Sequence, residues 1–192
     1  QVHGGSDFIY TIILWKLTGL KTIGSAKIYF AILILSIKFL SVALAYQITR
    51  LTSLEKNTKF IFFIIFSFFL ISLSHYDAPI NFSPFSYRDV FTILFLIFFI
   101  QIFLKNKNLY LLNSIITFIA FVSLIFHFDV GIYLYTLLFL YTVYLIIIKK
   151  FNHFFLIYFL LISFWLFFIY IVGIKEFYNL IENLLLIVRN QD

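Results

Sequence analysis

Eight ionisable side chains are candidates for chemistry in a chain that is otherwise almost entirely apolar: His3, Asp7, His75, Asp77, Arg88, Asp89, His127 and Asp129. In the most suggestive pair, Arg88 is followed directly by Asp89. An arginine guanidinium is a planar fork that suits phosphate or carboxylate, and a carboxylate can take the proton from an attacking hydroxyl group. These residue types therefore predict a site that holds a phosphate and activates an acceptor.

The expected roles follow from the side-chain types. We expect Asp7, Asp89 and Asp129 to be the candidate catalytic carboxylates. The candidate substrate-binding residues are Arg88, His127, His75, Asp77 and His3. Two carboxylates also have a structural alternative. Asp89 at a helix start would be stabilised by the helix dipole alone, and Asp129 could be a solvated residue beside a turn at Gly131.

Sequence motifs for cofactors and metals are absent. The chain has no cysteine, so it has no disulfide framework, no thiolate metal site and no cysteine nucleophile. It also has no glycine-rich phosphate loop and no metal-spaced set of histidines. We therefore identify no cofactor and assign no metal ligands. Binding of a divalent metal by the carboxylates stays an open alternative.

The composition determines which elements must position these residues. Of 192 residues, 64% are hydrophobic and only 11% are charged, and the mean hydropathy is +1.08. A soluble domain carries about 45–50% apolar and about 25% charged residues. An ordinary soluble enzyme, a disordered tail and a nucleic-acid-binding domain are thereby excluded. We expect an all-α, polytopic membrane bundle whose main partners are membrane lipids.

A spanning helix needs about 20 apolar residues, and six segments approach this length: 28–49, 60–76, 89–104, 109–127, 131–148 and 154–174. Residues 1–27 and 175–192 flank this six-span bundle of 28–174. Both flanks are too polar or too broken to span, and we expect each to form an amphipathic helix in the outer interface. Residues 1–192 then form a single transmembrane domain, which we interpret as a fragment of a longer protein.

The basic residues predict the orientation of the bundle. The first, third and fifth connections between the segments hold seven of them: Arg50, Lys56, Lys59, Lys105, Lys107, Lys149 and Lys150. The second and fourth connections hold only Arg88. Basic loops stay on the cytoplasmic side, so both chain ends and all eight candidate residues are expected on the outer side. A bacterial inner membrane is the expected location. The net charge of +6 belongs to these clusters and does not indicate a nucleic-acid partner.

The layout resembles part of a GT-C-type membrane glycosyltransferase. The resemblance rests on residues 3–7 (HGGSD), residues 83–89 (SPFSYRD) and residues 128–131 (FDVG), each of which precedes an expected helix. It implies acidic catalytic residues in outer loops and a polyprenyl-phosphate sugar as donor. Arg88 would then hold the lipid phosphate. The motifs are short, and a base contributed from upstream of Gln1 stays open.

Two other interpretations remain at the level of sequence. Arg88, with His127 one helical hairpin later, is similar to the outer-loop Arg and His of O-antigen-polymerase-like proteins, which also assemble glycans on a lipid carrier. A membrane transporter or flippase would use the outer polar residues as a vestibule for its substrate. In a non-catalytic membrane subunit these residues would serve neither catalysis nor transport. Lys38 is the sole charge well inside a segment, and we expect it to be structurally paired.

Overall fold

The described part of the chain consists of helices joined by short connections. In the computed structural model this part comprises residues 23–73, 85–104, 108–126 and 128–189. They form seven helices and no strand: α2 (Ile23–Leu51), α3 (Lys56–Leu73), α4 (Phe85–Phe103), α5 (Leu109–Phe126), α6 (Phe128–Ile147), α7 (Phe151–Val172) and α8 (Ile174–Arg189). The all-α prediction is confirmed for these residues, and each of the six expected apolar segments overlaps one of the helices α2 to α7. The expected interface helix within 1–27 falls largely outside the described residues.

Two of these helices are long and apolar enough to cross a membrane. They contain Val130–Ile147 in α6 and Phe151–Val172 in α7. Two shorter apolar stretches are Val90–Phe103 in α4 and Leu109–Ile125 in α5. Length and composition therefore support membrane association for this half of the chain.

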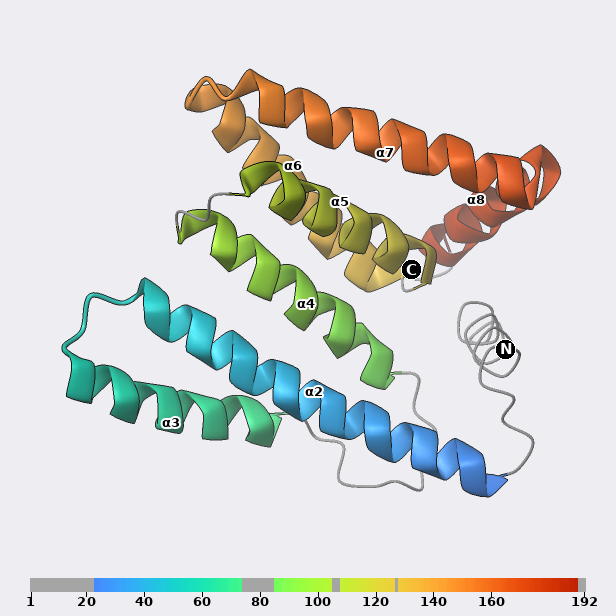
Figure 1. Cartoon of the computed structure of the whole chain (residues 1–192). Coiled ribbons are helices and arrows are strands. Elements are labelled where there is room, and N and C mark those ends of the chain that lie inside the picture. The colour runs from blue at the N-terminus through green and yellow to red at the C-terminus, as the bar shows by residue number, and fades with distance from the viewer. Residues whose placement is uncertain (1–22, 74–84, 105–107, 127, 190–192) are drawn as a thin grey trace.

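The helices α2 to α7 lie side by side with their axes roughly aligned (Figure 1). Helix α2 packs between α3 and α4, α4 packs on α5, and α6 and α7 both pack on α5. Helices α2 and α4 run in the same direction, whereas α5 runs opposite to α4 (Figure 1). Among the described helices, α3 contacts only α2. The bundle therefore has a central helix, α5, and a lightly held edge helix, α3.

The core lies where α4, α5, α6 and α7 meet. Its fully buried side chains include Phe95 from α4, Ile116 from α5, Leu134 and Leu138 from α6 and Ile157 from α7. Between helices that lie in a membrane, such side chains hold the helices together by van der Waals packing rather than by removal from water. The core thus joins four helices whose contacts are mostly between neighbours in sequence.

The outer surfaces of these helices are also apolar. Phe68 of α3 is 74% exposed and Tyr170 of α7 is 85% exposed. Many serine and threonine hydroxyls on the helices are satisfied locally. Ser41, for example, donates to the Ile37 carbonyl (2.9 Å), and Thr49 donates to the Ala45 carbonyl (2.7 Å). Such bonds within one helix satisfy a hydroxyl without water or a second helix.

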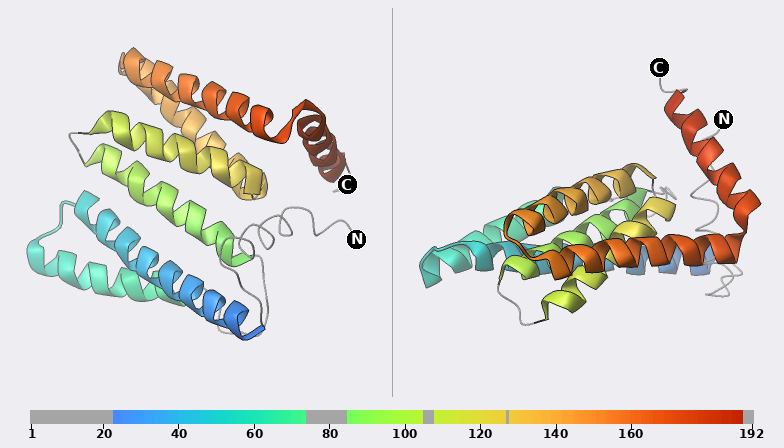
Figure 2. Two further views of the ribbon diagram at one scale, coloured as in Figure 1. Left: turned by 45° about the vertical axis from the view of Figure 1, so that its right-hand side comes forward. Right: turned by 90° about the horizontal axis from the view of Figure 1, so that it is seen from above.

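Helix α8 differs from the others in composition and direction. It is amphipathic, with Lys175 and Glu182 exposed and Phe177 packed against Trp165 of α7, the ring centroids 5.7 Å apart. Gly173 makes the corner with φ 91° and ψ 149°, a conformation that is essentially restricted to glycine. Figure 2 shows α8 turning sharply away from the direction of α7.

Helices α5 and α6 approach each other closely at Gly131. This residue is buried, and a Cβ atom there would overlap the backbone of Leu124 in α5. Gly131 was considered above as a turn residue before a helix, but the structure places it inside α6, which begins at Phe128. Its role is therefore to permit close packing of two helices rather than to make the turn.

Replacing Gly131 by Ala tests this close approach. In an unobstructed helix the change would stabilise by roughly 0.5–1 kcal/mol, but here the added methyl group must push α5 and α6 apart. We expect Gly131→Ala to lower the free energy of unfolding, measured in mixed micelles, by about 1–3 kcal/mol. Thr136→Ala, at an exposed position of the same helix, should change it by about 0.5 kcal/mol or less. A stabilised Gly131→Ala variant would contradict the packing.

Candidate functional site

The eight residues predicted from the sequence are only partly covered by the structure. His3, Asp7, His75, Asp77 and His127 lie outside the described residues. Arg88 and Asp89 belong to the first turns of α4, and Asp129 is the second residue of α6. Their backbone positions are described, whereas their side chains are not. A shared cavity formed by these residues therefore stays a prediction.

The backbone nevertheless places three of them at one end of the bundle. Helices α4 and α6 begin at the same end, where α5 and α7 finish (Figure 1). The helix starts that carry Arg88, Asp89 and Asp129 are therefore at this end, which we call the polar end. The opposite end, which we call the basic end, carries Arg50 at the close of α2 and Lys150 beyond α6.

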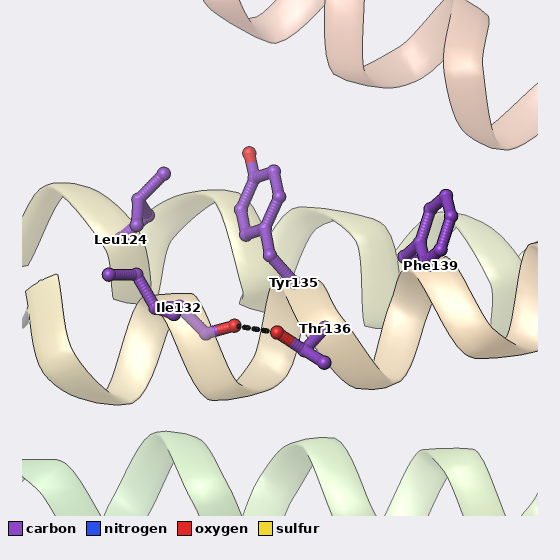
Figure 3. A pocket seen from close by; sticks show the side chains of 5 residues that line it. All are labelled: Leu124, Ile132, Tyr135, Thr136 and Phe139. Carbon is purple, nitrogen blue, oxygen red and sulfur yellow. Dashed lines mark hydrogen bonds between the residues drawn. The ribbon is translucent and has the colours of Figure 1, made fainter.

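A hollow of about 440 Å³ lies in the half of α6 nearer the polar end. It is lined by Leu124, Ile132, Tyr135, Thr136 and Phe139 (Figure 3). The Thr136 hydroxyl donates to the Ile132 carbonyl (2.9 Å). The buried Tyr135 hydroxyl approaches the Trp165 indole without completing a hydrogen bond. The lining is almost wholly apolar, so the hollow offers shape and apolar contact but no charged group.

A polar cluster that the sequence did not predict lies toward the basic end. Asn113 of α5 is 0% exposed and accepts a hydrogen bond on Oδ1 from the Tyr141 hydroxyl of α6 (3.1 Å). Its Nδ2 lies 3.2 Å from Nδ1 of His153 in α7. Tyr141 also packs edge-on against Phe99 of α4, with ring centroids 5.5 Å apart. We call Asn113, Tyr141 and His153 the three-helix polar cluster.

The order of these hydrogen bonds determines the state of the histidine. Because Tyr141 donates to Oδ1 of Asn113, the amide nitrogen is the group that faces His153, and it can only donate. His153 Nδ1 must then accept, so the neutral ring carries its proton on Nε2. Tyr110 of α5 packs against the same ring with centroids 4.4 Å apart. The imidazole is thus held on one edge and one face, leaving Nε2–H as its remaining donor.

A signal for this cluster was present in the sequence. Asn113 and Thr117 are four residues apart within an apolar segment, and an amide inside such a segment needs a partner. The candidate residues predicted from the sequence are all ionisable and do not include Asn113 or His153, because His153 beside Lys149 and Lys150 fits an interfacial position. Nothing in the spacing alone pairs Asn113 with residues 28 and 40 positions away.

Comparisons with known proteins add no identification. No protein-family model, no characterised protein and no solved structure matches the chain. Among the residues that the structure describes, no three His, Asp or Glu side chains are grouped so that they could hold a metal ion. The functional interpretation therefore depends on the helices and on the chemistry of the residues at each end.

A double-mutant cycle tests the three-helix polar cluster. Asn113→Leu leaves the buried Tyr141 hydroxyl without an acceptor, which should cost about 1–3 kcal/mol of unfolding free energy. Tyr141→Phe alone should cost about 1 kcal/mol. The double variant should lose about 0.5–1.5 kcal/mol less than the sum of the two. Tyr133→Phe, at a residue that is 71% exposed, is the matched control and should have no effect. Strict additivity would show that the two side chains do not interact.

Proposed function

We propose that the chain is a six-span membrane domain in which each of the helices α2 to α7 crosses the bilayer. Helices of 18 residues, such as α3 and α5, are about 27 Å long, close to the roughly 30 Å of the hydrocarbon core. The apolar outer surfaces of α3 and α7 support this assignment, because exposure of such surfaces is unfavourable in water and favourable in lipid. Helix α8 is amphipathic and turns out of the bundle direction, which suits the interface.

The distribution of charge supports the proposed orientation. Arg50, Lys56, Lys59, Lys149 and Lys150 lie at or next to helix ends at the basic end, whereas Arg88 is the only Lys or Arg that the sequence assigns to the two connections at the polar end. The basic end is the cytoplasmic one by the positive-inside rule. The polar end then faces outward, in a membrane that we propose to be a bacterial inner membrane.

At the polar end we propose a glycosyltransferase site that acts on a lipid-linked sugar. The observation that carries this proposal is the common end at which α4 and α6 begin with Arg88, Asp89 and Asp129. Arg88 would neutralise the departing phosphate, and Asp89, Asp129 or Asp7 would take the proton from the acceptor hydroxyl. The substrate would also be held by hydrogen bonds from His3, His75, His127 and Asp77.

The hollow of α6 supports a lipid-linked substrate over a soluble one. It begins at Ile132, three residues after Asp129, and it lies in a helix apolar enough to span the membrane. A hydrocarbon chain is the ligand that an apolar surface at this depth can take up from the bilayer. A polyprenyl-phosphate sugar would thus place its head at the polar end and its chain along α6.

A transporter or flippase is the second candidate function. The observation in its favour is the three-helix polar cluster, because polar side chains inside a membrane bundle often mark a substrate or ion pathway. Against it, Asn113, Tyr141 and His153 satisfy one another by hydrogen bonds. Lys38, a charged residue near the middle of α2, is partly buried, but α2 contributes no residue to this cluster.

The proposed topology can be tested with single cysteines, because the natural chain has none. A cysteine at Ser83 should react with a membrane-impermeant maleimide added to intact cells. A cysteine at Asn57, an exposed position at the start of α3, should react only after permeabilisation. Labelling of the Ser83 variant from the cytoplasmic side alone would reverse the orientation.

The proposed site can be tested by transfer of labelled sugar from lipid-linked donors in membranes that contain the protein. Arg88→Ala should lower transfer by about 100-fold or more at an unchanged protein level. Asp7→Asn, Asp89→Asn and Asp129→Asn should identify the base, since one of the three should show a comparable loss. Arg50→Ala, at the basic end, is the control and should retain activity.

Full activity of the Arg88→Ala variant would refute the proposed site. An exposed arginine that only caps a helix or pairs with Asp89 contributes at most about 1 kcal/mol to stability and nothing to chemistry. The topology would stand in that case.

A further inference from the structure

We propose that the corner between α6 and α7 binds the phosphate of an anionic lipid headgroup. Lys149 and Lys150 form this corner and both are exposed, and His153 follows in the first turn of α7. Lys150 lies within electrostatic range of the imidazole. The corner is at the basic end, remote from the residues of the proposed transferase site.

The histidine supplies a fixed donor to this site. Asn113, which is itself fully buried, engages Nδ1 of His153 at 3.2 Å, and the Tyr110 ring covers one face of the imidazole. The ring therefore cannot turn freely, and its Nε2–H is the donor left for a ligand. A phosphate oxygen accepts from such an N–H while the two ammonium groups supply the opposite charge.

No described carboxylate neutralises the two lysines. The acidic side chains that the structure describes are Glu55, Glu176 and Glu182. Glu176 and Glu182 belong to α8, which follows the far end of α7, and Glu55 lies between α2 and α3, neither of which packs on α6 or α7. The corner thus keeps its positive charge for a ligand from outside the chain.

The backbone of the corner favours glycine, yet the chain has a lysine. Lys149 has φ 58°, and its N–H bonds the Ile146 carbonyl (3.0 Å) while the Lys150 N–H bonds the Leu145 carbonyl (2.9 Å). This is the closing turn of a helix in which the left-handed residue is usually glycine. The lysine adds a charge at a position where glycine would make the same turn with less strain.

The surroundings of the corner match a lipid rather than a soluble phosphate. Ile147 is 71% exposed on one side, and Phe155 is 64% exposed on the other. Both belong to helices long and apolar enough to span a membrane. A ligand that combines an anionic head with a hydrocarbon chain can engage the lysines and this apolar surface together.

The test measures binding of fluorescent phosphatidylglycerol to the purified full chain in detergent micelles. Lys149→Gln combined with Lys150→Gln should raise the Kd by about 25-fold, because each surface lysine contributes about fivefold to anionic lipid binding. His153→Phe should raise it by about tenfold or more through loss of the N–H donor. Phosphatidylcholine should bind no differently to the variants and the parent.

The matched control changes the same charge at the same end of the bundle. Lys56→Gln combined with Lys59→Gln should leave the Kd within about twofold of the parent, because these lysines lie on α3, away from the corner. An equal loss in both double variants would overturn the proposal and indicate attraction to the basic end as a whole. Inorganic phosphate should compete only weakly. If it displaces the lipid at equal concentration, the corner is a site for free phosphate and the lipid assignment fails.

Discussion

The structure depends on one constraint, which is that its helices carry more apolar surface than they can bury against each other. In such a chain every backbone group has to be paired within its own segment, and helices satisfy this requirement without help from water. Many serine and threonine hydroxyls follow the same rule. Thr117 donates to the Asn113 carbonyl and Ser163 donates to the Phe159 carbonyl, each one turn earlier in its own helix. The packing between helices is therefore left almost entirely to shape.

Asn113 is the exception to this pattern, and it shows what shape alone does not provide. Apolar helices can slide or rotate against one another at small cost, because many arrangements bury similar areas. An amide that bonds one residue of α6 and one residue of α7 admits only one relative position of the three helices. The same amide that positions the helices also orients the imidazole of His153. The proposed hydrogen bond from His153 Nε2–H to a phosphate therefore depends on Asn113.

The positions of the helices could be predicted from the sequence better than which helices pack against each other. The expected segment 109–127 agrees with α5 (Leu109–Phe126), and the amphipathic stretch after residue 175 agrees with α8. The order of packing was not predictable, because helices such as α4 and α6 have no polar face to show which side is buried. The candidate site was predicted from residue types at the helix starts, and the backbone brings two of those starts to one end. The three-helix polar cluster was missed because its partners are distant in sequence.

The single neighbour of α3 has a consequence for how the bundle is assembled. The α2–α3 hairpin leaves the ribosome before α4 does, yet α4 docks on α2 at a surface that α3 does not occupy. In the six-span arrangement that we propose, the hairpin would enter the bilayer with one side of α2 facing lipid tails, and lipid would leave that side when α4 arrives. Among the described helices, none but α2 would lose a contact if α3 detached. In that arrangement, lipid or another helix could take the place of α3 while the core formed by α4, α5, α6 and α7 stays intact.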